Sequence, residues 1–472
     1  MRLTKIVCTL GPASSSEEGI GCLLDAGMEV ARLNFAHGSR ETHARLIERL
    51  RAAAEARGRG VAILQDLRGP KVRVGSIAGG SILLRGGDDV VLTGREIAGT
   101  PRELPVSYGD LHTAVRPGDR LLLAEGSIEL RVTAVAGQDI HCRIVVGGEI
   151  SPGKGIHVPN GLPHVPILDA EGREDVAFGV RHGVEYLGLS YVRTRDDVQT
   201  LRREIAHRQG GARIIAKIET AAALADLPGI LAEADGVMVA RGDLGIETPL
   251  EEVPHVQRRL IRLARDHAKP VIVATQMLRS MVESPSPTRA EVADIAGAVL
   301  DGCDALMLSE ETAVGRHPAE AVAMMARIAA AAERHCMLQL NPNRSSDREG
   351  EALAAAACSI AAELDAAAIV AATTRGASAR LIARHRPRQP LFAVTPRVET
   401  WRALALLYGV QPILAQGPAA VRGAVSTAAA AMRRAGLLSA HGGERRLVPV
   451  VVFAAPEGGR GSVAVEQLAA GD

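Results

Sequence analysis

Eight short apolar runs recur between Thr4 and Ser309, and each of them ends in a polar or charged residue. The runs are Thr4–Thr9, Glu29–Asn34, Ala62–Asp66, Tyr186–Ser190, Ile214–Glu219, Gly236–Arg241, Val271–Thr275 and Ala305–Ser309. A parallel strand that is buried on both faces reads as a continuous apolar run. Helical patterns such as Arg40–Ala56, Asp196–Gln209, Pro254–Ala268 and Thr288–Leu300 lie between the runs. Eight such units predict an α/β fold, a (β/α)8 barrel, in which side chains at the carboxyl ends of the strands form the functional face.

The alternation of strands and helices is interrupted once and then ends, which predicts three domains. Roughly a hundred residues separate the third run from the fourth, far more than a βα connection needs. Their short Val, Leu and Ile runs, broken by turn sequences, are typical of a small all-β domain. We therefore expect a barrel over residues 1–71 and 164–337, a β-barrel-like insertion over 72–163, and an open α/β domain over 338–472. Standing on the rim of the barrel, the insertion would act as a lid that excludes water.

Composition narrows the kinds of partner this chain has. Its 55 Lys and Arg residues balance 54 Asp and Glu residues, and aromatic residues make up only 2%. Neither a basic surface for nucleic acid or anionic membrane nor stacking platforms for bases are indicated. The six cysteines show no regular spacing, which argues against a disulfide framework and favours a reducing, cytoplasmic location.

Two carboxylates at neighbouring strand ends, Glu219 and Asp243, are the first candidates for chemistry. Together they can bind one hard divalent ion, Mg²⁺ or its substitute Mn²⁺, and leave positions open for substrate oxygens. Lys217 precedes Glu219 by two residues and so shares its face of the strand. An ammonium beside a metal and two acids suits stabilisation of a transferring phosphoryl group. The alternatives are that the acids are merely solvated and that Lys217 simply pairs with Glu219.

The sequence Gly242-Asp243-Leu244-Gly245 follows a strand, and a helical turn starting there would offer backbone N–H groups to an anion. Hydroxyls end three further strands, at Ser190, Thr275 and Ser309, where they could position a substrate or relay a proton. Each of these features is common at strand ends, so each one alone is weak evidence of function.

Several long motifs in this chain resemble those of the pyruvate kinase family, in the same order and with the same spacing. They are TKIVCTLGPAS, VARLNFAHG, DLRGPKVRVG, AKIE, VMVARGDLGIE, VIVATQML, PSPTRAEVADIAGAVLDGCDALMLS and ETAVG. The resemblance implies transfer of the phosphoryl group of phosphoenolpyruvate to ADP, giving pyruvate and ATP in glycolysis. It also implies Mg²⁺ as cofactor and a homotetramer, with no nucleic acid or membrane partner.

The resemblance assigns roles to residues in this chain. Glu219 and Asp243 would bind Mg²⁺, and Lys217 would neutralise the phosphoryl group during transfer. The remaining assignments are Arg32 and Arg73 to phosphate, Gly242, Asp243 and Thr275 to the substrate carboxylate, Ser190 to substrate binding, Thr275 and Ser309 to protonation of the enolate, and His37, Arg73 and Lys154 to the nucleotide. A solvated lysine is the alternative for Lys154, because the lid aligns loosely.

The chain departs from the family pattern at the site of the monovalent cation. Asn34 and Asp66 match the usual K⁺ ligands, but Ala36 stands where a serine would be. Lys71 replaces the glutamate of K⁺-requiring members, so its ammonium could supply the charge of the ion. We therefore expect that K⁺ is not required; the alternative is that Lys71 is a plain surface residue. Glu310 stands where a glycine is usual, and facing inward it would repel a phosphate.

A loop in the last domain resembles the family's binding loop for phosphorylated allosteric effectors. Its residues are Thr373, Thr374, Arg375, Gly376 and Ser378, and an ordinary βα turn is the alternative. Two other functions compete with the kinase: a lyase or aldolase that grips the same substrates, and a non-catalytic sensor. The lid and Lys154 disfavour the lyase, and retention of the whole charged set disfavours the sensor.

Overall fold

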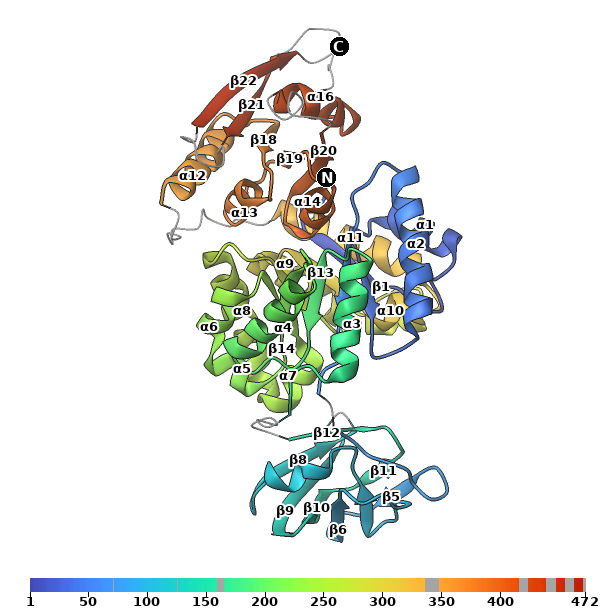
Figure 1. Ribbon diagram of the computed structural model, residues 1–472. Helices are drawn as coiled ribbons and strands as arrows, with labels where there is room; N and C mark the ends of the chain where they lie inside the picture. The colour runs from blue at the N-terminus through green and yellow to red at the C-terminus, as the bar shows by residue number, and fades with distance from the viewer. Residues whose placement is uncertain are drawn as a thin grey trace.

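The computed structural model describes residues 1–70, 72–124, 126–158, 165–335, 348–415, 423–438, 447–454 and 462–469. Three bodies follow one another along the long axis of the molecule (Figure 1). A helix-lined barrel lies in the middle, a β-rich body lies at one end of it, and an α/β body lies at the other.

The central body is a closed barrel of eight parallel strands, in the order β1-β17-β16-β15-β14-β13-β3-β2. The strands are β1 (Lys5–Thr9), β2 (Val30–Asn34), β3 (Ala62–Asp66), β13 (Tyr186–Leu189), β14 (Arg213–Ile218), β15 (Gly236–Ala240), β16 (Val271–Ala274) and β17 (Ala305–Leu308). Their residues are almost all buried, which is why each reads as an apolar run. Each predicted strand end lies within one residue of the observed end, and the predicted (β/α)8 barrel is confirmed.

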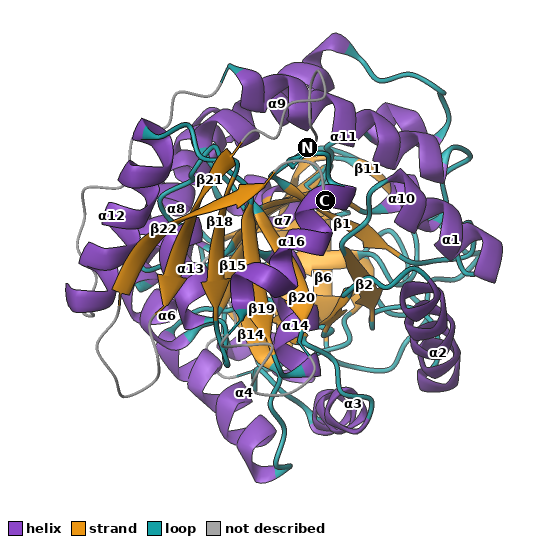
Figure 2. Cartoon of the chain, turned by 90° about the horizontal axis from the view of Figure 1, so that it is seen from above, coloured by secondary structure: helices purple, strands orange, loops and turns teal. Residues whose placement is uncertain are grey.

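Helices surround these strands, as the view from above in Figure 2 shows. They are α1 (Glu17–Ala26), α2 (Arg40–Ala56), α3 (Ala170–Arg181), α4 (Arg195–His207), α5 (Ala221–Ala225), α6 (Leu227–Glu233), α7 (Arg241–Glu247), α8 (Val253–Asp266), α9 (Arg289–Asp301), α10 (Glu310–Ala313) and α11 (Pro318–Arg334), with 3₁₀ turns η2 (Leu250–Glu252) and η3 (Arg279–Val282). Side-chain caps fix several starts: Ser39 accepts from the Thr42 amide at α2, and Thr288 and Glu291 form a reciprocal capping box at α9. Among the described residues, no helix is both long and apolar enough to cross a membrane.

The body between β3 and β13 is built of strands around its own apolar core. Its strands are β4 (Val72–Arg73), β5 (Ile82–Leu84), β6 (Asp89–Thr93), β7 (Glu103–Pro105), β8 (Arg120–Leu123), β9 (Ile128–Ala136), β10 (Asp139–Val146), β11 (Gly148–Ile150) and β12 (Gly155–His157), with one 3₁₀ turn, η1 (Gly109–Thr113). Seven strands form one sheet, and β11 pairs with β5 in a second. The additional β-rich domain predicted from the sequence is confirmed.

The third body is an open sheet in the order β20-β19-β18-β21-β22, in which only β22 is antiparallel to its neighbour. Its elements are α12 (Arg348–Glu363), β18 (Ala368–Ala372), α13 (Ala377–Ala383), β19 (Leu391–Thr395), α14 (Val398–Ala403), η4 (Leu404–Leu406), β20 (Val410–Leu414), α16 (Ala424–Arg434), β21 (Leu447–Ala454) and β22 (Ser462–Ala469). This is the predicted α/β domain. The domain boundaries at 71/72, 163/164 and 337/338 fall at or within stretches outside the described residues, so they stay as proposals.

The two outer bodies contact opposite ends of the barrel strands. At the amino ends, Lys5 donates through Nζ to the Val410 carbonyl at 2.7 Å, and Tyr186 donates through its hydroxyl to the Ala403 carbonyl at 2.8 Å. At the carboxyl ends, His157 of β12 lies 3.2 Å from an Asp243 carboxylate oxygen. The β-rich body therefore borders the end of the barrel where strand-end side chains converge.

Candidate active site

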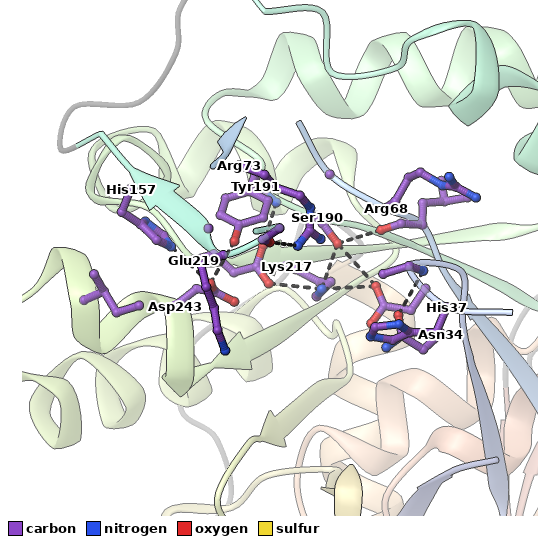
Figure 3. Close-up of a pocket in the computed structure, with 18 of the residues that line it drawn as sticks. Asn34, His37, Arg68, Arg73, His157, Ser190, Tyr191, Lys217, Glu219 and Asp243 are labelled. Carbon is purple, nitrogen blue, oxygen red and sulfur yellow. Dashed lines mark hydrogen bonds and ion pairs between the residues drawn. The ribbon is translucent and has the colours of Figure 1, made fainter. Parts of the chain in front are cut away.

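A cavity of about 400 Å³ opens between the carboxyl ends of the barrel strands and the β-rich domain (Figure 3). Most of its side chains are polar or charged. The lining residues are Asn34, Ala36, His37, Asp66, Leu67, Arg68, Gly69, Arg73, Ala124, Gly153, Lys154, Gly155, His157, Ser190, Tyr191, Lys217, Glu219, Asp243 and Ile246. Chain segments far apart in the sequence thus contribute to one site, as expected for this face of a barrel.

Lys217 is held at the floor of this cavity by three oxygen atoms. Its Nζ lies 3.1 Å from Asp66 Oδ1 and 3.0 Å from Glu219 Oε1, and it donates to Ser190 Oγ at 2.7 Å. Burial alone would lower the pKa of this ammonium, but the two carboxylates outweigh it and raise the pKa to about 12. Lys217 is therefore a fixed positive charge. The ion pair with Glu219, which the sequence left as an alternative, is present.

Asp66 links this lysine to the arginine that was predicted to bind phosphate. Arg32 donates through Nε to Asp66 Oδ2 at 2.7 Å, and its Nη1 donates to Thr9 Oγ1 at 3.0 Å. Burial would raise the pKa of the Asp66 carboxyl, but the charges of Lys217 and Arg32 hold it below its ordinary value. Arg32 is thereby oriented at the site, although it does not itself line the cavity.

The carboxylates of Glu219 and Asp243 are connected through Tyr191. The Tyr191 amide donates to Glu219 Oε2 at 2.6 Å, and its hydroxyl donates to Asp243 Oδ1 at 2.8 Å. Tyr191 itself has φ of 56°, an uncommon left-handed backbone conformation for a large side chain. Burial raises the pKa of the Glu219 carboxyl; Lys217 opposes that shift and Asp243 adds to it, and the net shift is upward.

His157 brings the β-rich domain into contact with Asp243 and with a further carboxylate, Glu247. Its Nε2 lies 3.2 Å from Asp243 Oδ1, its Nδ1 lies 3.7 Å from Glu247 Oε1, and its ring centroid is 5.9 Å from that of Tyr191. Burial lowers the pKa of this imidazole, but bonds to the two carboxylates raise it to about 9. His157 and Tyr191 were not predicted as site residues. Their positions in the sequence could have identified them as site residues. Tyr191 directly follows a predicted strand, and His157 lies in the lid segment that contains Lys154.

Not every predicted site residue lines the cavity. Gly242, Thr275 and Ser309 are absent from its lining. The Gly242 amide donates to Thr275 Oγ1 at 2.8 Å, and that hydroxyl donates to the Ala274 carbonyl at 2.6 Å. Thr275 has φ of 71°, a strained backbone of the kind that clusters at functional sites.

A second cavity of about 490 Å³ adjoins the first and shares part of its lining. Ala36, His37, Arg68, Gly69 and Arg73 line both. Of the predicted nucleotide contacts, His37 and Arg73 therefore line both cavities, and Lys154 lines the first. Arg73 also donates through Nη1 to the Gly153 carbonyl at 2.8 Å. Arg68, which the sequence reasoning missed, forms an ion pair with Asp175 at 3.1 Å.

Only part of the predicted monovalent-cation region lies among the described residues. Asn34 and Ala36 line the first cavity, and Asn34 Oδ1 accepts from the Ala36 amide at 3.2 Å. Asp66 already pairs with Arg32 and Lys217. Lys71 lies outside the described residues.

Two further sequence features lie away from the cavity. Glu310 pairs with Arg279 at 3.0 Å on the surface, so its carboxylate does not face inward. In the predicted effector loop, the Thr373 hydroxyl accepts from the Gly376 amide at 2.9 Å, and the Thr374 carbonyl accepts from Thr400. Arg375 is exposed there and Ser378 is buried.

The chemistry of the acids fits a small divalent cation. No group of three or more His, Cys, Asp or Glu side chains among the described residues is arranged to hold a metal ion. Mg²⁺ is commonly held by one or two carboxylates, with water and substrate oxygens completing its octahedron. Glu219 and Asp243 both line the cavity and are held by one tyrosine, so two hard oxygen donors are available.

The fold and this site define a barrel enzyme whose charged cleft lies between the barrel and an inserted β domain. Two family models cover most of the chain: pyruvate kinase, barrel domain, over residues 1–322, and pyruvate kinase, alpha/beta domain, over residues 351–461. The chain belongs to the pyruvate kinase family, and it is a phosphotransferase of that family.

Individual relatives agree with this assignment. The chain is 44% identical over 417 residues to pyruvate kinase 2 of Synechocystis sp., covering 88% of this chain and 71% of the relative. It is 43% identical over 413 residues to the pyruvate kinase of Corynebacterium glutamicum, covering 88% and 87%. The crystal structure of a pyruvate kinase from Cryptosporidium parvum superposes with a TM-score of 0.92 at 33% identity, covering 99% of this chain and 96% of that one.

Proposed function

We propose that this enzyme transfers the phosphoryl group of phosphoenolpyruvate to ADP in glycolysis, with Mg²⁺ and without K⁺. The observation that carries the proposal is the buried Lys217 ammonium, fixed between Asp66 and Glu219 beside Asp243. Phosphoryl transfer is catalysed mainly by positioning and by fixed positive charge, because negative charge is spread over the oxygens of the transferring group. A preorganised cation in a cavity supplies such a charge.

In the proposed reaction, the bond from phosphorus to the enol oxygen breaks, and a bond to a terminal oxygen of ADP forms. Lys217 would donate to the transferring phosphoryl group, with Arg32 and Arg73 binding its oxygens. His37, Arg73 and Lys154 would place the nucleotide across the two adjoining cavities, which is supported by the lining: His37 and Arg73 line both, and Lys154 lines the first. The lid domain that contains Lys154 would also exclude water from the site.

Glu219 and Asp243 are the residues that would hold Mg²⁺. Bound there, the ion would offset the charge of the substrate oxygens as a Lewis acid; Mn²⁺ would serve similarly. Tyr191 would keep Asp243 turned toward the cavity, since an outer hydrogen bond orients a metal-binding carboxylate.

The substrate carboxylate would lie against the amides of Gly242 and Asp243 and the Thr275 hydroxyl, replacing the bond that Gly242 now makes to Thr275. Ser190 would contact substrate through its place beside Lys217. The hydroxyls of Thr275 and Ser309 would belong to the network that delivers a proton to the enolate carbon. That proton completes pyruvate.

K⁺ independence is supported by the environment of Asp66. Ala36 offers no side-chain oxygen, and Asp66 already has two cationic partners. Lys71 would add the charge that a monovalent ion supplies elsewhere in the family. The proposal extends to a cytoplasmic homotetramer, and to a phosphorylated effector at the loop of Thr373, Thr374, Arg375, Gly376 and Ser378.

The test is pyruvate formation from phosphoenolpyruvate and ADP with Mg²⁺ in tetramethylammonium buffer, before and after K⁺ is added. We expect full activity without K⁺, and strong dependence on K⁺ in Lys71→Glu. Activity of the unchanged enzyme only with K⁺ would reject the role of Lys71 while keeping the kinase. No pyruvate in either buffer, from folded protein, would reject the kinase in favour of a lyase or a sensor.

A further inference from the structure

One side chain of the β-rich domain, His157, is enclosed against the barrel, and the proposed reaction assigns it no role. Its side chain is only 8% exposed, and both of its ring nitrogens face carboxylate oxygens of α7, Nε2 towards Asp243 and Nδ1 towards Glu247. In Figure 3, His157 lies at the same side of the pocket as Asp243. A buried polar ring costs free energy unless it is paired, so these contacts favour one position of the β-rich domain.

The barrel side of this contact is a single face of α7. Asp243, Ile246 and Glu247 are three and four residues apart, which places them on one side of a helix. Asp243 and Glu247 contact His157, and Ile246 approaches Gly126 of the β-rich domain, where an added Cβ would lie 3.9 Å from Ile246 Cγ2. We call the face formed by Asp243, Ile246 and Glu247 the domain seat.

The domain seat is held in place by the barrel beneath it. The Glu247 side chain is only 4% exposed, and its Oε2 accepts from the Ala221 amide at 2.9 Å, two residues after Glu219. Asp243 accepts from the Tyr191 hydroxyl. Both carboxylates therefore have a fixed orientation before His157 meets them.

Tyr191 also supports the β-rich domain at both of its chain connections. Its ring centroid lies 5.9 Å from that of His157, on the strand that leads out of the domain. A Cβ added at Gly69, on the segment that leads into the domain, would clash with the Tyr191 ring. The tyrosine ring thus lies beneath the entering and the leaving segments together.

The position of His157 is transmitted to two proposed nucleotide contacts. Lys154 lies three residues before it, and the Lys154 carbonyl accepts from the Val74 amide at 2.9 Å. Gly155 pairs with Arg73 between β12 and β4, and Arg73 also donates through Nη1 to the Gly153 carbonyl at 2.8 Å. Because these bonds join β12 to β4, a shift of His157 moves Lys154 and Arg73 with it.

We propose that His157 is a positioning residue for the nucleotide: it fixes the β-rich domain on the domain seat and so places Lys154 and Arg73 against the phosphates of a nucleoside diphosphate. The inference rests on the proposed function, which assigns Lys154 and Arg73 to the nucleotide. Lysine and arginine are suited to phosphate oxygens. Holding both cations in place before binding lowers the entropy cost of ordering them.

The test compares His157→Phe, which keeps a ring against Tyr191 and removes both nitrogen contacts, with His141→Phe on an exposed face of the same domain. One measurement is hydrogen–deuterium exchange of the full chain without ligand, read at the amides of α7 and β12. The other is calorimetric titration with ADP and, separately, with phosphoenolpyruvate, both with excess Mg²⁺. His157→Gln, which keeps a donor towards Asp243, is the conservative variant.

We expect exchange at α7 and β12 to be about tenfold faster in His157→Phe than in His141→Phe, because the domain leaves its seat more often. ADP affinity should fall about tenfold, since misplaced cations bind phosphate poorly. Phosphoenolpyruvate affinity should fall less than about threefold, because its proposed contacts, Arg73 excepted, belong to the barrel. His157→Gln should lie between the unchanged chain and His157→Phe in both measurements.

Equal exchange in His157→Phe and His141→Phe would overturn the domain seat. Faster exchange with unchanged ADP affinity, or an equal loss of affinity for ADP and phosphoenolpyruvate, would overturn the positioning role. The exchange measurement needs no nucleotide, so it decides the domain seat even if the unchanged chain binds no ADP, a result that would reject the proposed function itself. If His157→Phe folds poorly by circular dichroism, His157→Gln against His141→Phe gives the same comparison.

Discussion

Lys217 is a structural residue of this site, and in the proposed function it would also be a catalytic one. Its ammonium is almost fully enclosed and offsets two buried carboxylates, Asp66 and Glu219. Burying either acid without a counter-charge would be costly. The same ammonium lies at the floor of the cavity, where a phosphoryl group would approach. In the proposed function, stability and phosphoryl transfer would therefore depend on one charge, and experiment has to separate them.

We expect Lys217→Met to lower turnover by roughly three or more powers of ten, since it removes transition-state stabilisation. The same change should destabilise the fold by about 3 kcal/mol, because it leaves buried carboxylates without their partner. Steady-state kinetics and urea unfolding measure the two effects. The double variant Lys217→Met/Asp66→Asn is the control: it should regain stability but not turnover. Recovery of both would mean that Lys217 acts only structurally.

Tyr191→Phe tests the link between the two proposed metal ligands. The change keeps the ring and removes the hydroxyl that donates to Asp243 at 2.8 Å. We expect about tenfold weaker Mn²⁺ binding, measured by electron paramagnetic resonance without substrate, because outer hydrogen bonds orient metal ligands. Tyr186→Phe is the matched control, since its hydroxyl bonds Ala403 at the other end of the barrel. Unchanged Mn²⁺ affinity in Tyr191→Phe would remove Tyr191 from the metal site.

At the scale of single elements, each βα unit places the residues at the end of its strand at the mouth of the barrel. Most residues of the barrel strands are apolar and buried, and polar side chains such as Asn34, Asp66 and Lys217 lie at or near the carboxyl ends of their strands. The segment after β16 carries two consecutive left-handed residues, Thr275 and Gln276, at φ of 71° and 56°. The chain then forms η3, whose Ser280 is bonded to Glu291 of α9. The α9 cap thus also fixes the loop that follows Thr275.

Glu291 gives a pH-dependent prediction for this element. Partial burial raises the pKa of its carboxyl, but hydrogen bonds from Ser280 and Thr288 outweigh it and hold the pKa below its ordinary value. Such a carboxylate stabilises the fold above its unfolded pKa, and this contribution is lost as pH falls through the folded pKa. We expect Glu291→Gln to lower the free energy of unfolding at neutral pH, with the difference shrinking at acid pH. Urea titrations of both proteins measure it; a difference independent of pH would contradict the prediction.

At the scale of the whole molecule, the C-terminal domain is attached to the barrel by buried polar contacts. Arg386 donates to the Gly302 carbonyl at 2.9 Å and pairs with Asp304 at 2.6 Å, and its guanidinium lies 4.8 Å from the centre of the Tyr408 ring. Asp304 also accepts from the amides of Tyr408 and Val271. One carboxylate therefore joins a barrel strand, its neighbour and the C-terminal domain.

We expect Arg386→Met to destabilise the interdomain contact by about 3–5 kcal/mol, since it leaves Asp304 buried without its cation. Differential scanning calorimetry should then resolve two transitions in place of one, because the domains would no longer unfold together. The control is Arg386→Met/Asp304→Asn, which removes both charges and should recover much of the loss. A single transition at the original temperature in Arg386→Met would show that this pair does not couple the domains.

The sequence by itself determined the barrel, because its strands are buried on both faces and must read as uninterrupted apolar runs. It also determined Lys217, Glu219 and Asp243 as candidates, because polar residues near the carboxyl ends of such runs or shortly after them lie at the mouth of the barrel. The insertion was visible from its period-two patterns and turn residues. Each of these features depends on one short segment, so the residue pattern of that segment is enough to predict it.

Only the tertiary structure decided which of these residues meet. His157 and Asp243 are far apart in the chain, and only the seating of the β-rich domain brings them to 3.2 Å. Asp66 is the counter-ion of Lys217 because β3 and β14 lie close across β13. Gly242 faces Thr275 rather than open space, and Glu310 turns outward to Arg279. Such pairings depend on how strands close and domains dock, and no spacing within one segment specifies them.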